Sequence, residues 1–145
     1  MFRSKMLAIA INGDELCLQE HAMPEPLDHE VLIKVMAAGV NRADLMQRKG
    51  IYPPPPGASD ILGLEVAGII VACGKAVSTW CVGDRVCALL SGGAYAQYCT
   101  ASAVCCLPMI AQHTFEQAAA LPEALFTVWS SLFERAHLQA NECVL

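Results

Sequence analysis

The chain has 145 residues, the size of one ordinary domain, and its apolar runs are too short to span a membrane as a helix. With 55% hydrophobic and 16% charged residues, it is rich in apolar side chains for a soluble monomer, which predicts that some of its surface packs against another domain or subunit. The net charge of -5 excludes nucleic acid as a partner, because nothing would neutralise phosphates, and the lack of a basic amphipathic run excludes a membrane surface.

The N-terminal sequence indicates a cytoplasmic protein, and the cysteines are interpreted in that context. The apolar stretch at residues 6–11 is shorter than the core of a secretory leader and is followed at once by a polar turn. No cysteine pair has the spacing of a zinc or redox motif, so we expect small buried side chains, with Cys105 and Cys106 on opposite faces of a strand. The cysteines are Cys17, Cys73, Cys81, Cys87, Cys99, Cys105, Cys106 and Cys143.

Most of the chain is predicted to form short strands separated by turns. Asn12-Gly13-Asp14 is a hairpin turn signal, and Gly68 interrupts a later strand, which indicates a bulge or a close approach of two backbones. The predicted strands are residues 5–11, 16–20, 30–38, 64–73, 85–90, 94–100 and 104–107. Many short strands with glycine turns are typical of a barrel or a sandwich, so the fold class is mainly β with a few helices.

Helices are predicted in two places. Asn41 can cap a short helix that runs to Arg48, and a stiff loop of four prolines follows at residues 53–56. Thr114 begins a capping box ahead of an alanine-rich helix, which Pro122 should end or kink. The second helix should cover residues 123–136. Its apolar stripe consists of Leu125, Val128, Trp129, Leu132 and Phe133.

Several motifs in register resemble one known family. They are residues 38–44 (AGVNRAD), 48–53 (RKGIYP), 62–65 (LGLE), 82–86 (VGDRV), 93–96 (GAYA) and 117–124 (QAAALPEA). The chain resembles the zinc-independent quinone oxidoreductases of the medium-chain dehydrogenase/reductase superfamily, and within them the branch of the tumour-suppressor-inducible quinone oxidoreductase. The resemblance covers essentially the whole chain.

This resemblance implies a GroES-like, partly open β-barrel over residues 1–145, which forms the substrate side of an enzyme. A Rossmann domain that binds the dinucleotide would follow, and its GxGxxG loop is not found in this sequence. The implied reaction is hydride transfer from NADPH to a quinone or enone, in a parent enzyme that is a homodimer. The 145-residue chain by itself is expected to be inactive, and its oligomeric state is left open.

The resemblance also singles out Asn41. Zinc-dependent relatives place a cysteine ligand at this position and a histidine at the position of Leu64, so no catalytic zinc is expected here. The amide of Asn41 can instead bond a ribose hydroxyl, a water or a quinone oxygen. A helix cap is the alternative role, and one amide can serve both.

Two further candidates come from the resemblance. Tyr52 would lie at the mouth of the substrate cleft and bond a developing oxyanion, or else pack against the prolines that follow it. Thr127 would approach the nicotinamide, or else bond back within its own helix. Arg42 is expected to pair with Glu65 or another carboxylate in a structural role.

Two other functions remain open at this point. Reduction of an enoyl thioester is a nearby reaction in the same superfamily. A stand-alone GroES-like domain that binds a protein partner without catalysis is the alternative from another class.

Overall fold

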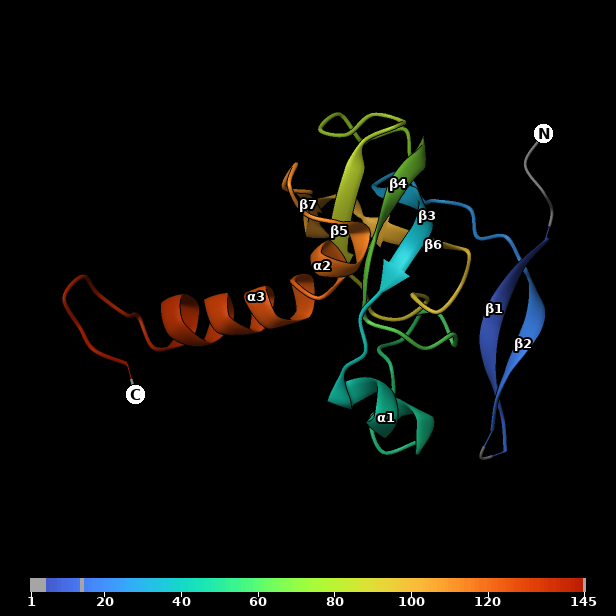
Figure 1. Ribbon diagram of the computed structural model, residues 1–145, viewed down its shortest axis with the longest axis horizontal. Helices are drawn as coiled ribbons and strands as arrows, with labels where there is room; N and C mark the ends of the chain where they lie inside the picture. Colours follow the sequence, from blue (N-terminus) through green and yellow to red (C-terminus); the bar gives the residue numbers. More distant parts are fainter. Residues whose placement is uncertain (1–4, 14, 145) are drawn as a thin grey trace.

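The computed structural model describes residues 5–13 and 15–144, which form a hairpin, a five-stranded antiparallel sheet and a set of helices (Figure 1). The sheet order is β6-β3-β4-β5-β7. The strands are β1 (Lys5–Asn12), β2 (Glu15–Ala22), β3 (Glu30–Ala38), β4 (Glu65–Cys73), β5 (Arg85–Leu89), β6 (Tyr98–Ser102) and β7 (Cys106–Pro108). The helical elements are α1 (Arg42–Arg48), η1 (Ala103–Cys105), α2 (Phe115–Ala119), α3 (Pro122–Trp129) and η2 (Ser130–Arg135).

The core lies against the central strands of the sheet. Val31, Ile33, Val66, Ile70 and Val86 are all fully buried there. These β-branched residues favour a pleated strand and pack well on its surface. Burial of each such side chain contributes about 1.5–3 kcal/mol, so this cluster holds β3, β4 and β5 together.

The hairpin of β1 and β2 continues the sheet into a partly open barrel. A bridge pairs Ala8 with Ala96, and the backbone N–H of Ile9 donates to the Tyr95 carbonyl at 2.8 Å. Met6 and Ala8 bury their side chains with Ile61 beneath this contact. The predicted mainly-β barrel is therefore observed.

Two glycine predictions are confirmed. Gly13 has a φ of +61° in the turn between β1 and β2; Asp14 beside it lies outside the described residues. Gly68 lies where a β-carbon would meet the carbonyl oxygen of Lys34, next to a register shift after Val35. Both a close backbone approach and a local bulge are thus present at Gly68.

Several predicted strand ends are shifted by one or two residues, and three differences are larger. β6 begins at Tyr98 rather than residue 94, because the backbone before it bonds to the hairpin and to Leu62. Residues 103–105 form the turn η1, so Cys106 is a strand residue and buried while Cys105 is not in the strand. The last predicted helix is split into α3 and the π-helix η2.

Pro122 separates the two C-terminal helices as predicted. α2 ends at Ala119, and Pro122 is the first residue of α3, a position where its missing N–H costs nothing. α3 and η2 then run away from the sheet, while α1 lies at another end of the barrel (Figure 1). Within the described residues no helix has the length and apolar character needed to cross a bilayer.

Candidate functional site

Asn41 lies between the end of β3 and the start of α1. It is the N-cap residue of α1 and forms a capping box with Asp44, whose carboxylate accepts the Asn41 backbone N–H at 2.7 Å. The side-chain amide nitrogen of Asn41 donates to the Glu65 carboxylate at 2.8 Å. Asn41 is therefore the N-cap residue, as predicted, but its side chain makes no cap hydrogen bond and its amide instead reaches across to β4.

Asp44 is held from a second side by Tyr95. The Tyr95 hydroxyl donates to the same Asp44 oxygen at 2.8 Å and lies 3.3 Å from the Gly39 carbonyl oxygen. Asp44 is only 2% exposed, and its other oxygen has no partner among the described residues. Burial, together with the hydrogen bond to Asp44, raises the pKa of Tyr95 well above its usual value, so this phenol stays protonated and remains a donor.

Glu65 joins Asn41 to the start of α3. Its side chain is buried, and its second carboxylate oxygen accepts the backbone N–H of Glu123 at 3.0 Å. The expected pairing of Arg42 with Glu65 is wrong: in the part of the chain that the structure describes, no ion pair joins them. We call the set formed by Gly39, Asn41, Asp44, Glu65, Tyr95 and Glu123 the polar junction.

Thr127 lies one helical turn beyond Glu123 on α3 and is exposed. It lines a groove with a volume of about 990 Å³, and most of the other lining residues are apolar. This apolar groove is lined by Leu89, Leu107, Leu125, Phe126, Thr127, Val128, Trp129, Ser130, Ser131, Phe133, Glu134 and Arg135. The helix thus connects the polar junction at one end with the apolar groove along its side.

Tyr52 lies in the bend that follows α1 and is 48% exposed. Among the described residues no hydrogen bond joins it to Asn41 or to Thr127, and it does not line the apolar groove. Asn41 does not line the groove either, although it reaches α3 through Glu65. The structure therefore links two of the three predicted residues and leaves Tyr52 apart from them.

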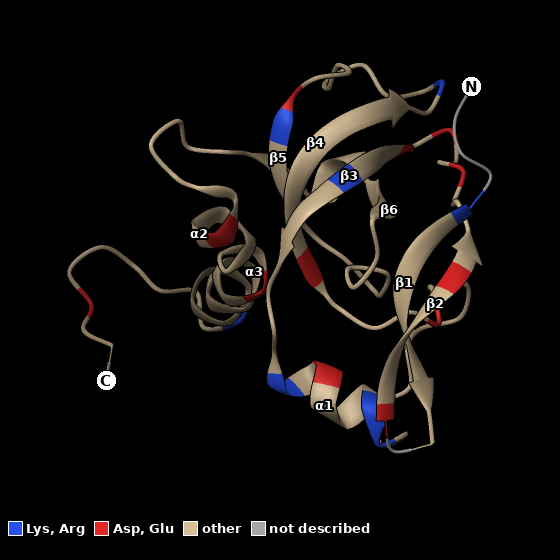
Figure 2. Cartoon of the chain, turned by 45° about the vertical axis from the view of Figure 1, so that its right-hand side comes forward, with Lys and Arg blue, Asp and Glu red and all other residues tan. Residues whose placement is uncertain are grey.

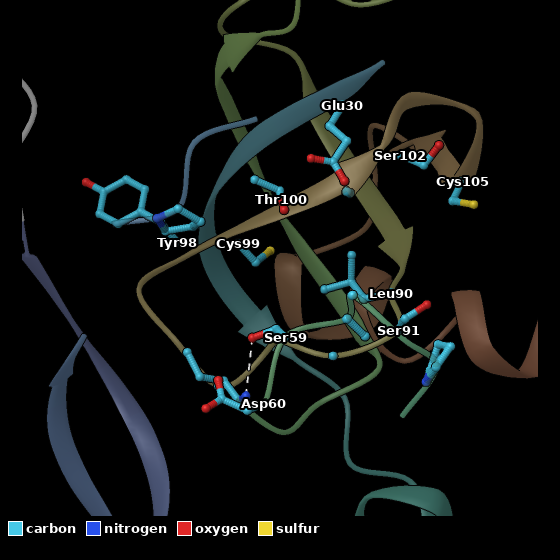
Figure 3. Close-up of a pocket in the computed structure, with 18 of the residues that line it drawn as sticks. Glu30, Ser59, Asp60, Leu90, Ser91, Tyr98, Cys99, Thr100, Ser102 and Cys105 are labelled. Atoms are coloured by element: carbon cyan, nitrogen blue, oxygen red, sulfur yellow. Dashed lines mark hydrogen bonds between the residues drawn. The ribbon is translucent and has the colours of Figure 1, made fainter. Parts of the chain in front are cut away.

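A second cavity of about 500 Å³ lies between the hairpin and the sheet (Figure 3). Its lining is mixed, with the polar residues Glu30, Ser102, Thr100 and Tyr98 on one side and Ser59 on the other. None of the predicted site residues and none of the polar junction lines it. It shares one lining residue, Leu89, with the apolar groove.

Charged residues are spread along the hairpin, the central strands and α1 (Figure 2), and two of them, Asp44 and Glu65, are buried. Burial raises the pKa of Cys99 and of Cys106 to about 12, so both remain neutral thiols near pH 7. Over the described ranges no group of three or more His, Cys, Asp or Glu side chains is arranged to hold a metal ion.

Sequence reasoning missed the partners that make the polar junction. It did not connect Tyr95 or Asp44 with Asn41, and it paired Glu65 with Arg42. The signal that was present is Gly39: a β-carbon there would overlap the Glu65 carboxylate. A glycine directly after a strand, paired with a buried glutamate, indicates a close contact of this kind.

Comparison with known proteins shows which families share this sequence and fold. Residues 27–112 match the family of the alcohol dehydrogenase GroES-like domain. The synaptic vesicle membrane protein VAT-1 homolog-like of Mus musculus is 36% identical over 97% of this chain and 35% of that protein. The quinone oxidoreductase of Lama guanicoe is 40% identical over 86% of this chain and 38% of that protein. The chain therefore spans little more than a third of the length of these relatives.

Solved structures share the fold. The human VAT-1 homolog-like protein superposes with a TM-score of 0.84 at 35% identity, over 94% of this chain and 45% of that one. The Escherichia coli quinone oxidoreductase complexed with NADPH superposes with a TM-score of 0.74 at 31% identity, over 93% of this chain and 41% of that one. CurK enoyl reductase superposes with a TM-score of 0.79 at 31% identity, over 93% of this chain and 44% of that one. These matches confirm the GroES-like fold.

Proposed function

Because the chain belongs to the alcohol dehydrogenase GroES-like domain family, we propose that it is the substrate-side domain of a zinc-independent, NADPH-dependent quinone oxidoreductase of the tumour-suppressor-inducible branch. The observation that carries this proposal is the amide of Asn41, fixed by Glu65 next to a helix that carries Thr127 along an apolar groove. Such a wall suits a flat, electron-poor carbonyl ring with one oxygen to be bonded.

Each candidate residue has a distinct role in this proposal. The Asn41 amide donates a hydrogen bond to the ligand oxygen or to the cofactor ribose, and Thr127 faces the nicotinamide ring across the groove. Tyr52 closes the cleft from the proline-rich loop and bonds oxygen charge as it develops. Orientation and hydrogen bonding are what the protein contributes, since a quinone is already electron-poor.

The residues present fit one end of a dinucleotide. An apolar groove suits the faces of a nicotinamide ring, and Thr127 supplies a polar group in its lining, while the Asn41 amide lies outside the groove on Glu65. When bound, NADPH supplies the hydride. The relatives are more than twice as long as this chain, so we place the cradle for the phosphates in a second domain of the whole protein, which we propose to be a cytoplasmic homodimer.

Zinc does not fit this donor set. Leu64 has no ligand atom, and the amide of Asn41 is already bonded to Glu65. Zinc sites in proteins need thiolate, imidazole or carboxylate ligands in a tetrahedral set. No step of the proposed reaction therefore uses a metal.

A chimaera tests this proposal. The chain replaces the matching segment of the Escherichia coli quinone oxidoreductase, and NADPH oxidation is followed with a fully substituted benzoquinone, which the thiols of the chain cannot alkylate. We expect quinone-dependent oxidation that Asn41→Ala lowers by about tenfold or more. A chimaera that folds, binds NADPH and reduces neither quinones nor enones would falsify the proposal.

Reduction of an enoyl thioester is the second candidate, favoured by the similarity to CurK enoyl reductase. The same chimaera separates the two functions, because the acceptor panel includes an enoyl thioester beside the quinone. A preference for the thioester of more than about tenfold in kcat/KM would assign the chain to that reaction instead.

A further inference from the structure

We propose that Glu65 is a positioning residue that fixes the amide of Asn41 so that it offers an N–H donor to the ligand, which makes the site selective for an acceptor oxygen such as a carbonyl. This inference rests on the proposed function, which it deepens by naming the residue that sets the polarity of the site. Glu65 acts through Asn41 and touches neither substrate nor cofactor.

The first step is the direction of the Asn41 amide. The side-chain NH₂ of Asn41 donates to a Glu65 carboxylate oxygen at 2.8 Å, so this end of the amide faces Glu65. The capping box turns the side-chain oxygen of Asn41 toward the backbone N–H of Asp44 without a side-chain cap hydrogen bond. The second N–H of the amide is not used by Glu65 and is left for a ligand, and Asn41 is half-buried rather than enclosed.

The second step is the fixed position of Glu65 itself. It is 3% exposed, and its other oxygen accepts the Glu123 N–H at 3.0 Å. With both oxygens occupied by donors, the carboxylate cannot turn without losing a bond at the start of α3 or at Asn41. The direction of the amide and the start of the helix carrying Thr127 are thus set by one side chain.

The third step is the room that Gly39 leaves. A β-carbon at position 39 would overlap Oε1, Cδ and Cγ of Glu65, so a larger residue displaces the carboxylate. The Gly39 backbone N–H also bonds the Glu65 carbonyl at 3.2 Å, which holds the two segments side by side. Gly39→Ala therefore disturbs Glu65 without removing any polar atom.

The chemical consequence is a choice of ligand. A site that offers an N–H binds a carbonyl or hydroxyl oxygen, whereas a ligand that brings only donors leaves the amide unpaired. If the amide were turned over, its oxygen would face the ligand and select donors. Glu65 therefore makes the site selective for carbonyl acceptors, although it never touches them.

The test on the 145-residue chain is the nuclear magnetic resonance spectrum of the Asn41 side-chain amide, labelled with ¹⁵N. We expect one of its protons to be shifted downfield and to exchange with water about tenfold more slowly than those of the exposed Asn12. Glu65→Gln and Gly39→Ala should both abolish the difference. Glu30→Gln is the matched control, because Glu30 also accepts a backbone N–H, that of Leu27 at 3.0 Å, and it should leave the Asn41 signals unchanged.

The functional readout uses the chimaera described above. Glu65→Gln and Gly39→Ala should lower kcat for a carbonyl acceptor by at least about tenfold while KM for NADPH stays within about twofold. Slow exchange in the wild type that both variants abolish supports the positioning role even if the chimaera is inactive, in which case the proposed function alone fails. Asn41 protons that exchange like those of Asn12, or an active chimaera whose kcat neither variant lowers, overturn it.

Discussion

The polar junction and the apolar groove both include residues of α3, but they differ in how far their side chains are buried and paired within the chain. In the polar junction, Asp44 and Glu65 are 2% and 3% exposed and accept hydrogen bonds from Asn41, Tyr95 and Glu123. In the apolar groove, Leu125, Val128, Trp129 and Phe133 are each between 44% and 61% exposed. The chain pairs its own polar wall except for one oxygen of Asp44, and it leaves its apolar wall uncovered.

This difference indicates that the apolar groove, rather than the polar junction, needs another domain or subunit to cover it. Buried donors and acceptors lose free energy unless they are paired, which is why the chain itself supplies most of the partners in the junction. Apolar surface can instead stay exposed until another domain or subunit covers it, and contiguous apolar patches mark such contacts. The composition predicted exposed apolar surface, and α3 and η2 carry a contiguous part of it.

The largest loss of stability should come from Asp44→Ala, in the polar junction. Two donors, the Tyr95 hydroxyl and the Asn41 N–H, would lose a charged acceptor, at a cost of about 3–5 kcal/mol in the free energy of unfolding. Urea unfolding followed by circular dichroism measures it. Asp60→Ala, at an exposed carboxylate, is the control and should cost below about 0.5 kcal/mol; equal losses would contradict the role given to the junction.

Alkaline pH should weaken the interior on which both regions rest. Burial raises the pKa of Cys99 from 9.0 to about 12, so above pH 9 the unfolded chain ionises this thiol while the folded chain does not. Stability should fall as the pH rises from 9 toward 12, by about 1–3 kcal/mol at pH 11. Unfolding curves at several pH values measure this. Cys99→Ala should remove the share of this thiol and leave that of Cys106, and Cys143→Ala, at an exposed thiol, should not change the dependence.

Tyr95→Phe measures the stability that one hydrogen-bond donor contributes to the polar junction. The ring stays in place while the bond to Asp44 is lost, so we expect a loss of about 1–2 kcal/mol. Tyr98→Phe is matched, since its hydroxyl has no hydrogen-bond partner among the residues described. A cost for Tyr98→Phe as large as that for Tyr95→Phe would assign the loss to general packing instead.

The smallest effect on stability should come from the apolar groove. Trp129 is 61% exposed and its ring lies 4.7 Å from that of Phe133, so Trp129→Gln should cost below about 1 kcal/mol. The same variant should bind less of an environment-sensitive apolar dye. Val104→Gln, at an isolated residue that is 86% exposed, should leave dye binding unchanged. A loss above about 2 kcal/mol for Trp129→Gln would show that the groove is part of the core.

Local sequence predicted the fold where local rules decide it. The turn at Gly13, the close approach at Gly68 and the break at Pro122 follow from backbone freedom or from a missing N–H, and all three are observed. The start of β6 was misplaced because residues before Tyr98 bond to the hairpin, a contact that no local pattern encodes.

The candidate site was less predictable, because its contacts join distant segments. Asn41 was identified, but its bond to Glu65 crosses 24 positions and that of Tyr95 to Asp44 crosses 51. Charge alone suggested an Arg42 partner for Glu65, whereas the fold supplies neutral donors from an amide and a helix start. The roles of Asn41, Tyr52 and Thr127 toward a ligand stay predictions for the chimaera to decide.

The winding of the π-helix η2 sets the direction of the residues that follow it. Its backbone bonds skip one residue more than those of an α-helix, as the bond from the Ala136 N–H to the Ser131 carbonyl at 3.0 Å shows. Removal of one residue from this turn would restore ordinary α-helical winding and rotate everything beyond it by about 100°. A single insertion or deletion at this point can therefore re-aim whatever the helix leads to, while the barrel keeps its own packing.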